Sequence, residues 1–138
     1  MRQRHQPSRT RRFPLAEGPG SVARCRDLTR QVLEEWFSLT GPAGRLLTSD
    51  VLLLVSEIAT NAYKHGGAPY ELRLDRAPGR LWVQVSDTSA KRPRPRGPHR
   101  AARVSGHGLY LLERLSAGWG WAPRGRGKAV WFVVVIPE

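Results

Sequence analysis

The chain has 138 residues, enough for one domain with a buried core and too few for two domains of ordinary size. It carries 23 Lys and Arg against 11 Asp and Glu, a net charge of +12, and its single cysteine, Cys25, excludes an internal disulfide. No stretch is apolar over the roughly 20 residues of a membrane-spanning helix, and the N-terminus lacks the apolar run of a signal peptide. We therefore expect a cytoplasmic protein without a membrane partner.

The positive charge is concentrated in two segments. Five arginines lie within residues 2–12 and six Lys or Arg within residues 91–103, and neither segment contains an acid. The rest of the chain has twelve basic and eleven acidic residues and is nearly neutral. A domain that binds duplex nucleic acid typically carries a basic stripe on an ordered element. We therefore do not expect a nucleic-acid partner. Solvated arginines in flexible segments explain the charge at least as well as a nucleic-acid site does.

The N-terminal residues are polar, basic and without periodicity, which predicts a disordered tail over residues 1–12 and a single domain over residues 13–138. A short edge strand is expected at residues 12–15. Ser21 is the expected N-cap of a first helix, because its hydroxyl can accept a hydrogen bond from the first turn. Apolar residues then recur at helical spacing as far as Trp36.

A second helix follows after a break. Two glycines and a proline at residues 41–44 are expected to end the first helix, and Ser49 with Asp50 to open the second. Residues 51–64 contain no Gly or Pro, and the pair at 66–67 is the glycine punctuation expected after a helix.

The hydrophobic period then changes from near 3.6 to 2. Residues 70–75 and 81–86 alternate between apolar and polar side chains, and residues 77–79 supply a turn, so a β-hairpin is predicted. The Pro- and Arg-rich stretch at residues 88–105 is long for a loop in a compact domain, and such loops are usually functional or disordered.

The C-terminal part contains a third helix and a second hairpin. The helix is predicted from Leu109 to near Gly118, and strands are predicted around residues 119–122 and 128–136, joined by a turn at 123–127. The order helix, helix, hairpin, loop, helix, hairpin predicts an α+β fold. We expect a two-layer sandwich of a mostly antiparallel sheet with three helices on one face.

Polar residues interrupt the apolar run of the second helix. Glu57 and Asn61 are four residues apart and share a helix face, and Lys64 and His65 continue near the same stripe. Carboxylate and amide oxygens suit Mg²⁺, and a carboxylate can alternatively take a proton from an attacking hydroxyl. A solvated helix face would carry the same pair.

Two further features stand near this helix in the predicted fold. Gly106-His107-Gly108-Leu109 opens the third helix, where backbone amides and the helix dipole favour an anion such as phosphate, although glycines here also make ordinary turns. Asp87 ends an apolar strand, where it can cap a turn or accept a hydrogen bond from a ligand amine.

The order and spacing of these features resemble the three conserved boxes of the GHKL (Bergerat-fold) ATPases. The matching residues are Glu57-x-x-x-Asn61, the strand that ends in Asp87, and Gly106-x-Gly108-Leu109 after a long loop. The chain is most similar to stand-alone bacterial anti-sigma-factor serine/threonine kinases and their actinobacterial relatives. Its small size, the Trp-Gly-Trp at 119–121 and the Gly-Lys-Ala-Val-Trp-Phe at 127–132 carry that similarity.

The resemblance implies ATP and Mg²⁺ as ligands and a role for each box. Asn61 would hold Mg²⁺, Glu57 would be the general base, and Asp87 would accept from the adenine amino group. Residues 88–105 would be the ATP lid. The phosphates would meet Gly106, His107, Gly108 and Leu109, with positive charge or a hydrogen bond from Lys64, His65 and Lys128.

The implied activity is that of an ATP-dependent serine/threonine protein kinase. Its implied partners are an anti-sigma-factor antagonist as phosphate acceptor and a sigma factor, and relatives often form homodimers. One departure is present: the second box usually reads Asp-x-Gly-x-Gly, whereas residues 87–91 read Asp-Thr-Ser-Ala-Lys. A second hypothesis is therefore a non-catalytic module that uses the nucleotide as a structural ligand or sequesters a sigma factor, and a third is a basic nucleic-acid binder.

Overall fold

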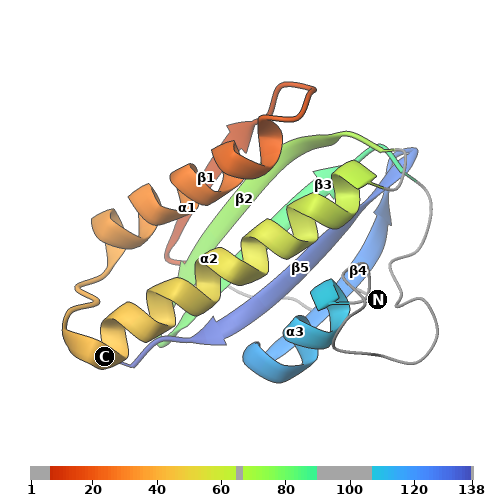
Figure 1. Ribbon diagram of the computed structural model, residues 1–138. Coiled ribbons are helices and arrows are strands. Elements are labelled where there is room, and N and C mark those ends of the chain that lie inside the picture. Colours follow the sequence, from red (N-terminus) through yellow and green to blue (C-terminus); the bar gives the residue numbers. More distant parts are fainter. Residues whose placement is uncertain (1–6, 65–66, 90–106, 138) are drawn as a thin grey trace.

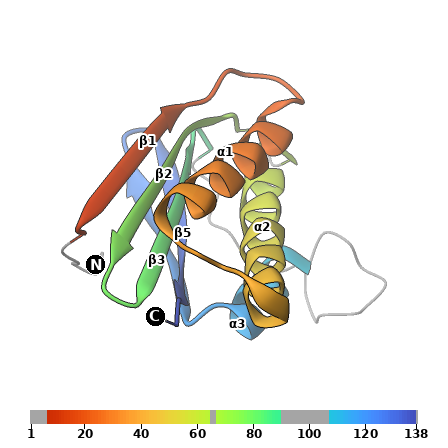
Figure 2. The same ribbon diagram turned by 90° about the vertical axis from the view of Figure 1, so that its left-hand side faces the viewer.

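The computed structural model describes residues 7–64, 67–89 and 107–137, and for residues 107–109 the backbone alone. The elements are β1 (Arg9–Pro14), α1 (Ser21–Trp36), α2 (Gly41–Lys64), β2 (Pro69–Ala77), β3 (Arg80–Asp87), α3 (His107–Leu115), β4 (Gly118–Arg124) and β5 (Gly127–Val135). The five strands form one antiparallel sheet in the order β1-β2-β3-β5-β4. Helices α1, α2 and α3 cover one face of this sheet (Figures 1 and 2). The predicted α+β sandwich is confirmed.

The edge strand β1 begins earlier than the sequence predicts. Disorder was expected over residues 1–12, but Arg9 to Arg12 pair with β2, and residues 1–6 lie outside the described part. The Thr10 hydroxyl donates to Asp75 at 2.8 Å, and Arg11 forms an ion pair with Glu35 at 2.8 Å. Strand pairing and acidic partners therefore order a segment whose composition indicated a tail.

The first helix has its expected length but not its expected cap. Gly20 occupies the N-cap position and has no side chain that could accept a capping hydrogen bond. Ser21 is already the first residue of the helix. The Ser21 hydroxyl is buried and has no hydrogen-bond partner among the residues that the structure describes. The N-cap prediction for Ser21 is wrong, because this side chain faces the protein interior and not the free amides of the first turn.

Helix α2 starts at Gly41, eight residues before the predicted start at Ser49, and runs for 24 residues. Pro42 is tolerated in the first turn, where its missing N–H would have had no helical partner. Gly44 is required by packing: a Cβ at this position would lie 2.4 Å from the carbonyl carbon of Leu39. The glycines and proline therefore shape the start of the helix and do not interrupt it.

Both predicted hairpins are present. The β2–β3 turn contains Gly79 with φ of 69°, and the β4–β5 turn contains Gly125 with φ of 58°, backbone conformations that favour glycine. Helix α3 ends at Leu115, three residues before the predicted end, because Gly118 already belongs to β4. Among the described residues no helix has the length and apolarity that crossing a membrane demands.

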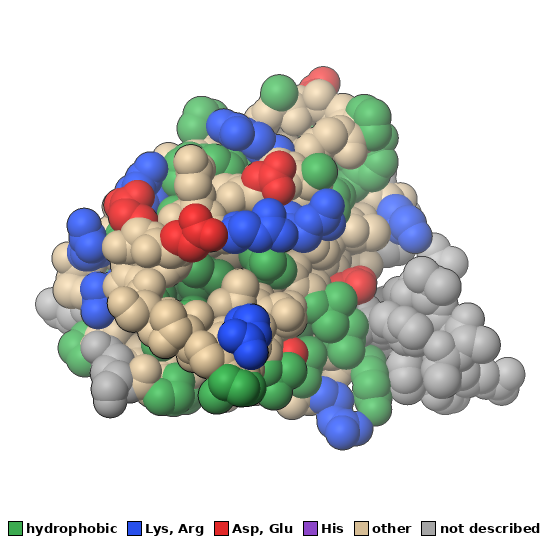
Figure 3. Space-filling model, turned by 60° about the vertical axis from the view of Figure 1, so that its left-hand side comes forward, with side chains coloured by type: hydrophobic (Ala, Val, Ile, Leu, Met, Phe, Trp, Pro, Cys, Tyr) green, Lys and Arg blue, Asp and Glu red, His purple; other side chains and the backbone are tan. Residues whose placement is uncertain are grey.

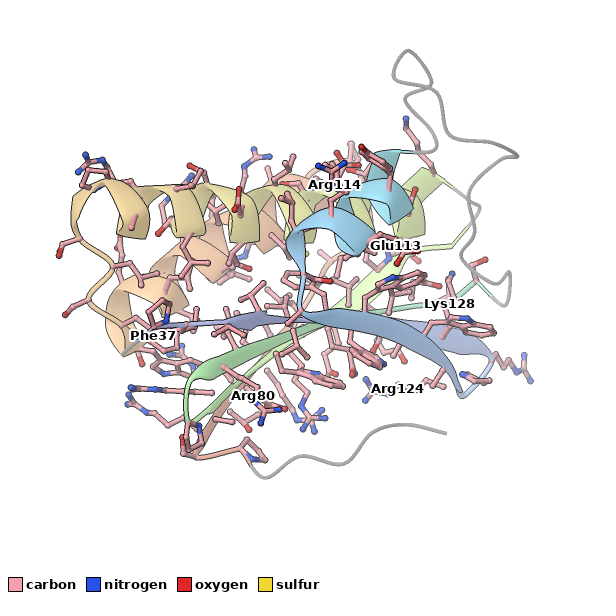
Figure 4. All side chains as sticks on the ribbon, turned by 90° about the horizontal axis from the view of Figure 1, so that it is seen from below. Phe37, Arg80, Glu113, Arg114, Arg124 and Lys128 are labelled. Carbon is pink, nitrogen blue, oxygen red and sulfur yellow. The ribbon has the colours of Figure 1, made fainter. Side chains whose placement is uncertain are left out.

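The core lies between the sheet and the helices, where Phe132 and Leu74 of the sheet and Leu54 and Ile58 of α2 are buried. The opposite face of the sheet carries aromatic and charged side chains, including a stack of Trp82 on Trp131 with ring centroids 4.4 Å apart. Figure 4 shows Arg80 and Arg124 on this second face. Buried side chains on the helical face therefore set which strand residues point toward α2 and α3.

Candidate functional site

Glu57 and Asn61 lie in the C-terminal half of α2, both partly exposed. Their orientation follows from the helix period, because Leu54, Ile58 and Ala62 are buried on the side that packs on the sheet. Glu57 and Asn61 are thereby kept near the surface, one turn apart on the same helix. Lys64, the last residue of α2, is exposed, and the predicted site residue His65 lies outside the described part of the chain.

The chain after α2 is attached to the chain after β3. The Ala68 amide donates to the Thr88 hydroxyl at 2.9 Å, and the Thr88 amide donates to the Ala68 carbonyl at 3.2 Å. Gly67 lies so close to Ser89 that a Cβ on Gly67 would be 2.6 Å from the Ser89 Cβ. These contacts place the segment that follows α2 against the strand end that carries Asp87.

Asp87 is fully buried at the end of β3, with 0% of its surface exposed. Its Oδ1 accepts hydrogen bonds from the Ser89 amide at 2.8 Å and from Lys128 Nζ at 3.1 Å. Lys128 Nζ is also 3.1 Å from Oδ2 in the ion pair, and Oδ2 accepts no hydrogen bond from the described residues. A buried carboxylate oxygen is therefore left with unused acceptor capacity.

Burial governs the protonation of this carboxyl. Desolvation raises the pKa of Asp87 above its ordinary value, and the hydrogen bonds from Lys128 and Ser89 together with the Lys128 charge act in the opposite direction. A second ionisable group, Cys25, lies in α1 away from this region, and burial raises its pKa to about 12. The Cys25 thiol is thus not a nucleophile at neutral pH.

Lys128 faces the helical layer from the start of β5. The register pairs it directly with Asp87. Lys128 lies on the same side of β5 as the buried residues Val130 and Phe132, which follow at every second position. Its ammonium also donates to the Ser89 carbonyl at 3.4 Å. Lys128 was predicted to add charge or a hydrogen bond near the phosphates; its observed partners are Asp87 and Ser89.

Helix α3 begins at His107, two residues before the predicted start at Leu109, so His107 and Gly108 belong to its first turn. Gly106 and residues 90–105 of the predicted lid lie outside the described residues. Leu112 is buried where α3 packs on α2, and the two helices lie side by side in Figure 1. The three predicted motifs thus occupy neighbouring elements: α2, the end of β3 and the start of α3.

The oxygen atoms at this site suit a metal ion that is bound partly by the protein and partly by a ligand. No cluster of three or more His, Cys, Asp or Glu side chains that could hold a metal ion is present in the described ranges. Mg²⁺ typically takes one or two protein oxygens and completes its shell with water and substrate phosphates. The Asn61 amide and the Glu57 carboxylate fit that requirement, and the unused Asp87 Oδ2 fits an amine donor of a ligand.

A cavity of about 500 Å³ lies elsewhere, between the end of α1 and the opposite end of the sheet, and Phe37, Arg76 and Ile136 are among its lining residues. Phe37 and Lys128 are seen at opposite ends of the sheet in Figure 4. No residue predicted for the site lines this cavity, which is therefore separate from the candidate site.

Sequence reasoning found Asp87 and Lys128 individually but missed their ion pair and the role of Ser89. The alternation of the last strand carried a usable signal, because Lys128 shares its side with Val130 and Phe132. The ion-pair partner of Lys128 could not be assigned, because the sequence of β5 does not indicate which strands lie beside it.

Comparison with known proteins gives one family and two similar solved structures. The model of the family described as histidine kinase-like ATPase domain matches residues 19–134. No curated protein matches the sequence. A crystal structure of the RsbU and RsbW domains of a Mycobacterium tuberculosis protein is similar with a TM-score of 0.66 and 18% identity, over 96% of this chain and 33% of that chain.

The histidine kinase domain of a blue-light activated histidine kinase from Erythrobacter litoralis is similar with a TM-score of 0.53 and 20% identity. That match covers 85% of this chain and 60% of the other. The chain thus spans about a third of the first structure and less than two thirds of the second. At these identities the likeness concerns the fold.

Proposed function

Because the chain belongs to the histidine kinase-like ATPase domain family, we propose that it binds ATP with Mg²⁺ and acts as an anti-sigma-factor-type serine/threonine protein kinase. The main support is the pair of hydrogen bonds between Ala68 and Thr88, which joins the segment after α2 to the end of β3. In this proposal the acid and the amide of α2 and the buried carboxylate at the end of β3 face the same nucleotide.

Each residue has a proposed part in binding. Asp87 Oδ2 accepts a hydrogen bond from the nucleobase amino group, since it is a buried acceptor that the described residues leave unused. Asn61 binds Mg²⁺ through its amide oxygen, and Lys64 and His65 add positive charge or a hydrogen bond near the phosphates. The backbone at the start of α3, with Gly106, His107, Gly108 and Leu109, binds the phosphates, and residues 88–105 act as the lid.

Glu57 is the proposed general base. It accepts the proton of a protein serine or threonine hydroxyl, whose oxygen then forms a bond to the γ-phosphorus while the bond to the bridging oxygen of ADP breaks. The partly exposed position of Glu57 on α2 suits an acceptor that arrives from outside the domain. The proposed acceptor is an anti-sigma-factor antagonist.

The proposed partners rest on the resemblance of the sequence motifs to anti-sigma-factor kinases. The M. tuberculosis structure that contains a domain described as RsbW is similar in fold and is compatible with this proposal. We propose an antagonist as substrate, a sigma factor as binding partner and a cytoplasmic location. A homodimer is a further part of the proposal.

The second candidate function is a non-catalytic nucleotide-binding module. Ser89 stands two residues after Asp87, where the family pattern carries a glycine. The Thr88 hydroxyl accepts a hydrogen bond from the Ala68 amide. The Ser89 backbone donates to Asp87 and accepts from Lys128. This arrangement favours a rigid nucleobase site over a mobile one.

Substitution of Asn61 and Glu57 separates binding from transfer. Asn61→Ala is expected to weaken Mg²⁺-dependent ATP binding by about tenfold or more and to leave binding in EDTA unchanged, because only the metal contact is lost. Glu57→Gln is expected to bind ATP within about threefold of wild type and to lose at least about 100-fold in phosphate transfer. Calorimetry and transfer of labelled γ-phosphate to the cognate antagonist measure the two effects.

Asp50→Asn, on the same helix two turns earlier, is the matched control and should change neither quantity. An equal loss of ATP binding in Asn61→Ala and Glu57→Gln would show that the roles are wrongly divided. Wild-type protein that binds ATP and transfers no phosphate would favour the non-catalytic module.

A further inference from the structure

The Asp87–Lys128 pair presents two complementary groups side by side. Both side chains are almost wholly buried, with 0% and 5% of their surface exposed. The Lys128 ammonium has three N–H groups, of which one serves Asp87 Oδ1 and one the Ser89 carbonyl. Asp87 Oδ2 accepts no hydrogen bond from the described residues, and Lys128 Nζ lies 3.1 Å from it in the ion pair, so the third N–H and this oxygen lie next to each other. The pair therefore offers one hydrogen-bond donor next to one acceptor.

A purine edge can satisfy such a pair in two ways. A 6-amino purine donates from its amino group to the carboxylate and offers ring N1 as an acceptor to the ammonium. A 6-keto purine offers its carbonyl oxygen to the ammonium and donates its N1–H to the carboxylate. An isolated carboxylate has no donor for the keto oxygen, and a buried acceptor without a donor is costly.

We propose that Lys128 is a specificity-determining residue of the nucleotide site, which lets the site take 6-keto purine nucleoside triphosphates as well as ATP. This inference rests on the proposed nucleotide-binding function. The pair is close to electrically balanced, so the choice between the two bases depends on hydrogen-bond direction more than on charge. A base that carries its donor at N1 and its acceptor at position 6 can still bond to both groups, because Lys128 supplies a donor and Asp87 an acceptor.

Ser89 holds both members of this pair. Its amide donates to Asp87, its carbonyl accepts from Lys128, and 7% of its own surface is exposed. These two bonds fix the relative position of the groups that meet the base.

The test compares ATP with inosine triphosphate, which carries a carbonyl oxygen where adenine carries the amino group. Wild-type protein with Mg²⁺ is expected to bind the two within about threefold of each other. Lys128→Thr and Lys128→Met are expected to retain ATP binding and to prefer ATP by about tenfold or more, because the keto oxygen has lost its donor. Calorimetry and a competition assay give the ratio of dissociation constants.

Arg73→Met is the matched control, because Arg73 forms a similarly buried ion pair with Asp75 at 2.8 Å on the other face of the sheet. It should leave the ratio as in wild type. A wild-type preference for ATP of tenfold or more overturns the inference without any variant, and so does an unchanged ratio in folded Lys128 variants; ATP binding in either case leaves the proposed function standing. Failure of wild type and variants to bind either nucleotide contradicts both proposals.

Discussion

Asp87 is held in place by backbone as well as by charge. Gly127, the residue before Lys128, approaches β3 so closely that a Cβ would lie 1.8 Å from the carbonyl oxygen of Asp87. A contact this short leaves room for hydrogen alone. The position of the carboxylate and the register that pairs it with Lys128 both depend on this approach.

Gly127→Ala is expected to lower the free energy of unfolding by roughly 1–3 kcal/mol, because the strand must move away from a rigid backbone atom. Urea denaturation measures the change. Gly118→Ala, on the neighbouring strand β4, is the matched control, since a Cβ there meets nothing within 4 Å. Gly127→Ala as stable as wild type would show that β5 can shift without loss.

The pairing of Asp87 with Lys128 shows where residue-level prediction ends. Strand alternation placed both residues at the correct strand ends, and the family resemblance implied a ligand role for each. Their contact spans 41 positions of sequence and depends on β5 lying next to β3, which no local pattern encodes. Ser89 was missed for the same reason, because its partner Lys128 comes from a strand far along the chain.

Helix α2 is the element that carries most of the proposed site. Its 24 residues extend from Gly41 to Lys64, and only the C-terminal half holds Glu57 and Asn61. Its first turns pack against the connection at Leu39 through Gly44, and α1 packs along α2, with Arg26 donating to the Ser56 hydroxyl at 3.5 Å. Packing at the start of the helix and along α1 therefore sets the direction of the half that holds Glu57 and Asn61.

Gly44→Ala is expected to destabilise the protein, although alanine is the better helix former by about 1 kcal/mol. The new Cβ would meet the Leu39 backbone at 2.4 to 3.0 Å, so the connection between α1 and α2 must shift. Thermal unfolding gives the sign of the change. Ser49→Ala at an exposed position of the same helix should be neutral or slightly stabilising, and a stabilising Gly44→Ala would refute the packing argument.

Elements were predicted correctly where the hydrophobic periodicity was strong. They were predicted wrongly where a boundary was inferred from glycine and proline alone. The hairpin of β2 and β3 and the end of α2 followed directly from alternation and from residues 66–67. The start of α2 was placed too late because Pro42 and Gly44 were interpreted as breakers. Proline is accepted in a first helical turn, and a glycine can be required by a neighbouring backbone. The strand at Arg9 was missed because its stability comes from β2 and from acidic partners.

At the scale of the whole molecule, several surface arginines are paired with acidic side chains. Arg12 and Arg124 both form ion pairs with Glu71, at 3.3 and 2.7 Å, and Arg11 pairs with Glu35. Figure 3 shows basic and acidic side chains interspersed on one face. These ion pairs tie the basic side chains of β1 and β4 to acidic side chains of β2 and α1.

The fold and family place the three motifs on neighbouring elements, and the chemistry of those residues carries the account to ATP and Mg²⁺. The most direct test is calorimetry of the wild-type protein with ATP, with and without Mg²⁺. We predict one site per chain, a dissociation constant below about 1 mM, and at least about tenfold weaker binding when Mg²⁺ is chelated. No binding of ATP at millimolar concentration in the presence of Mg²⁺ would contradict the account.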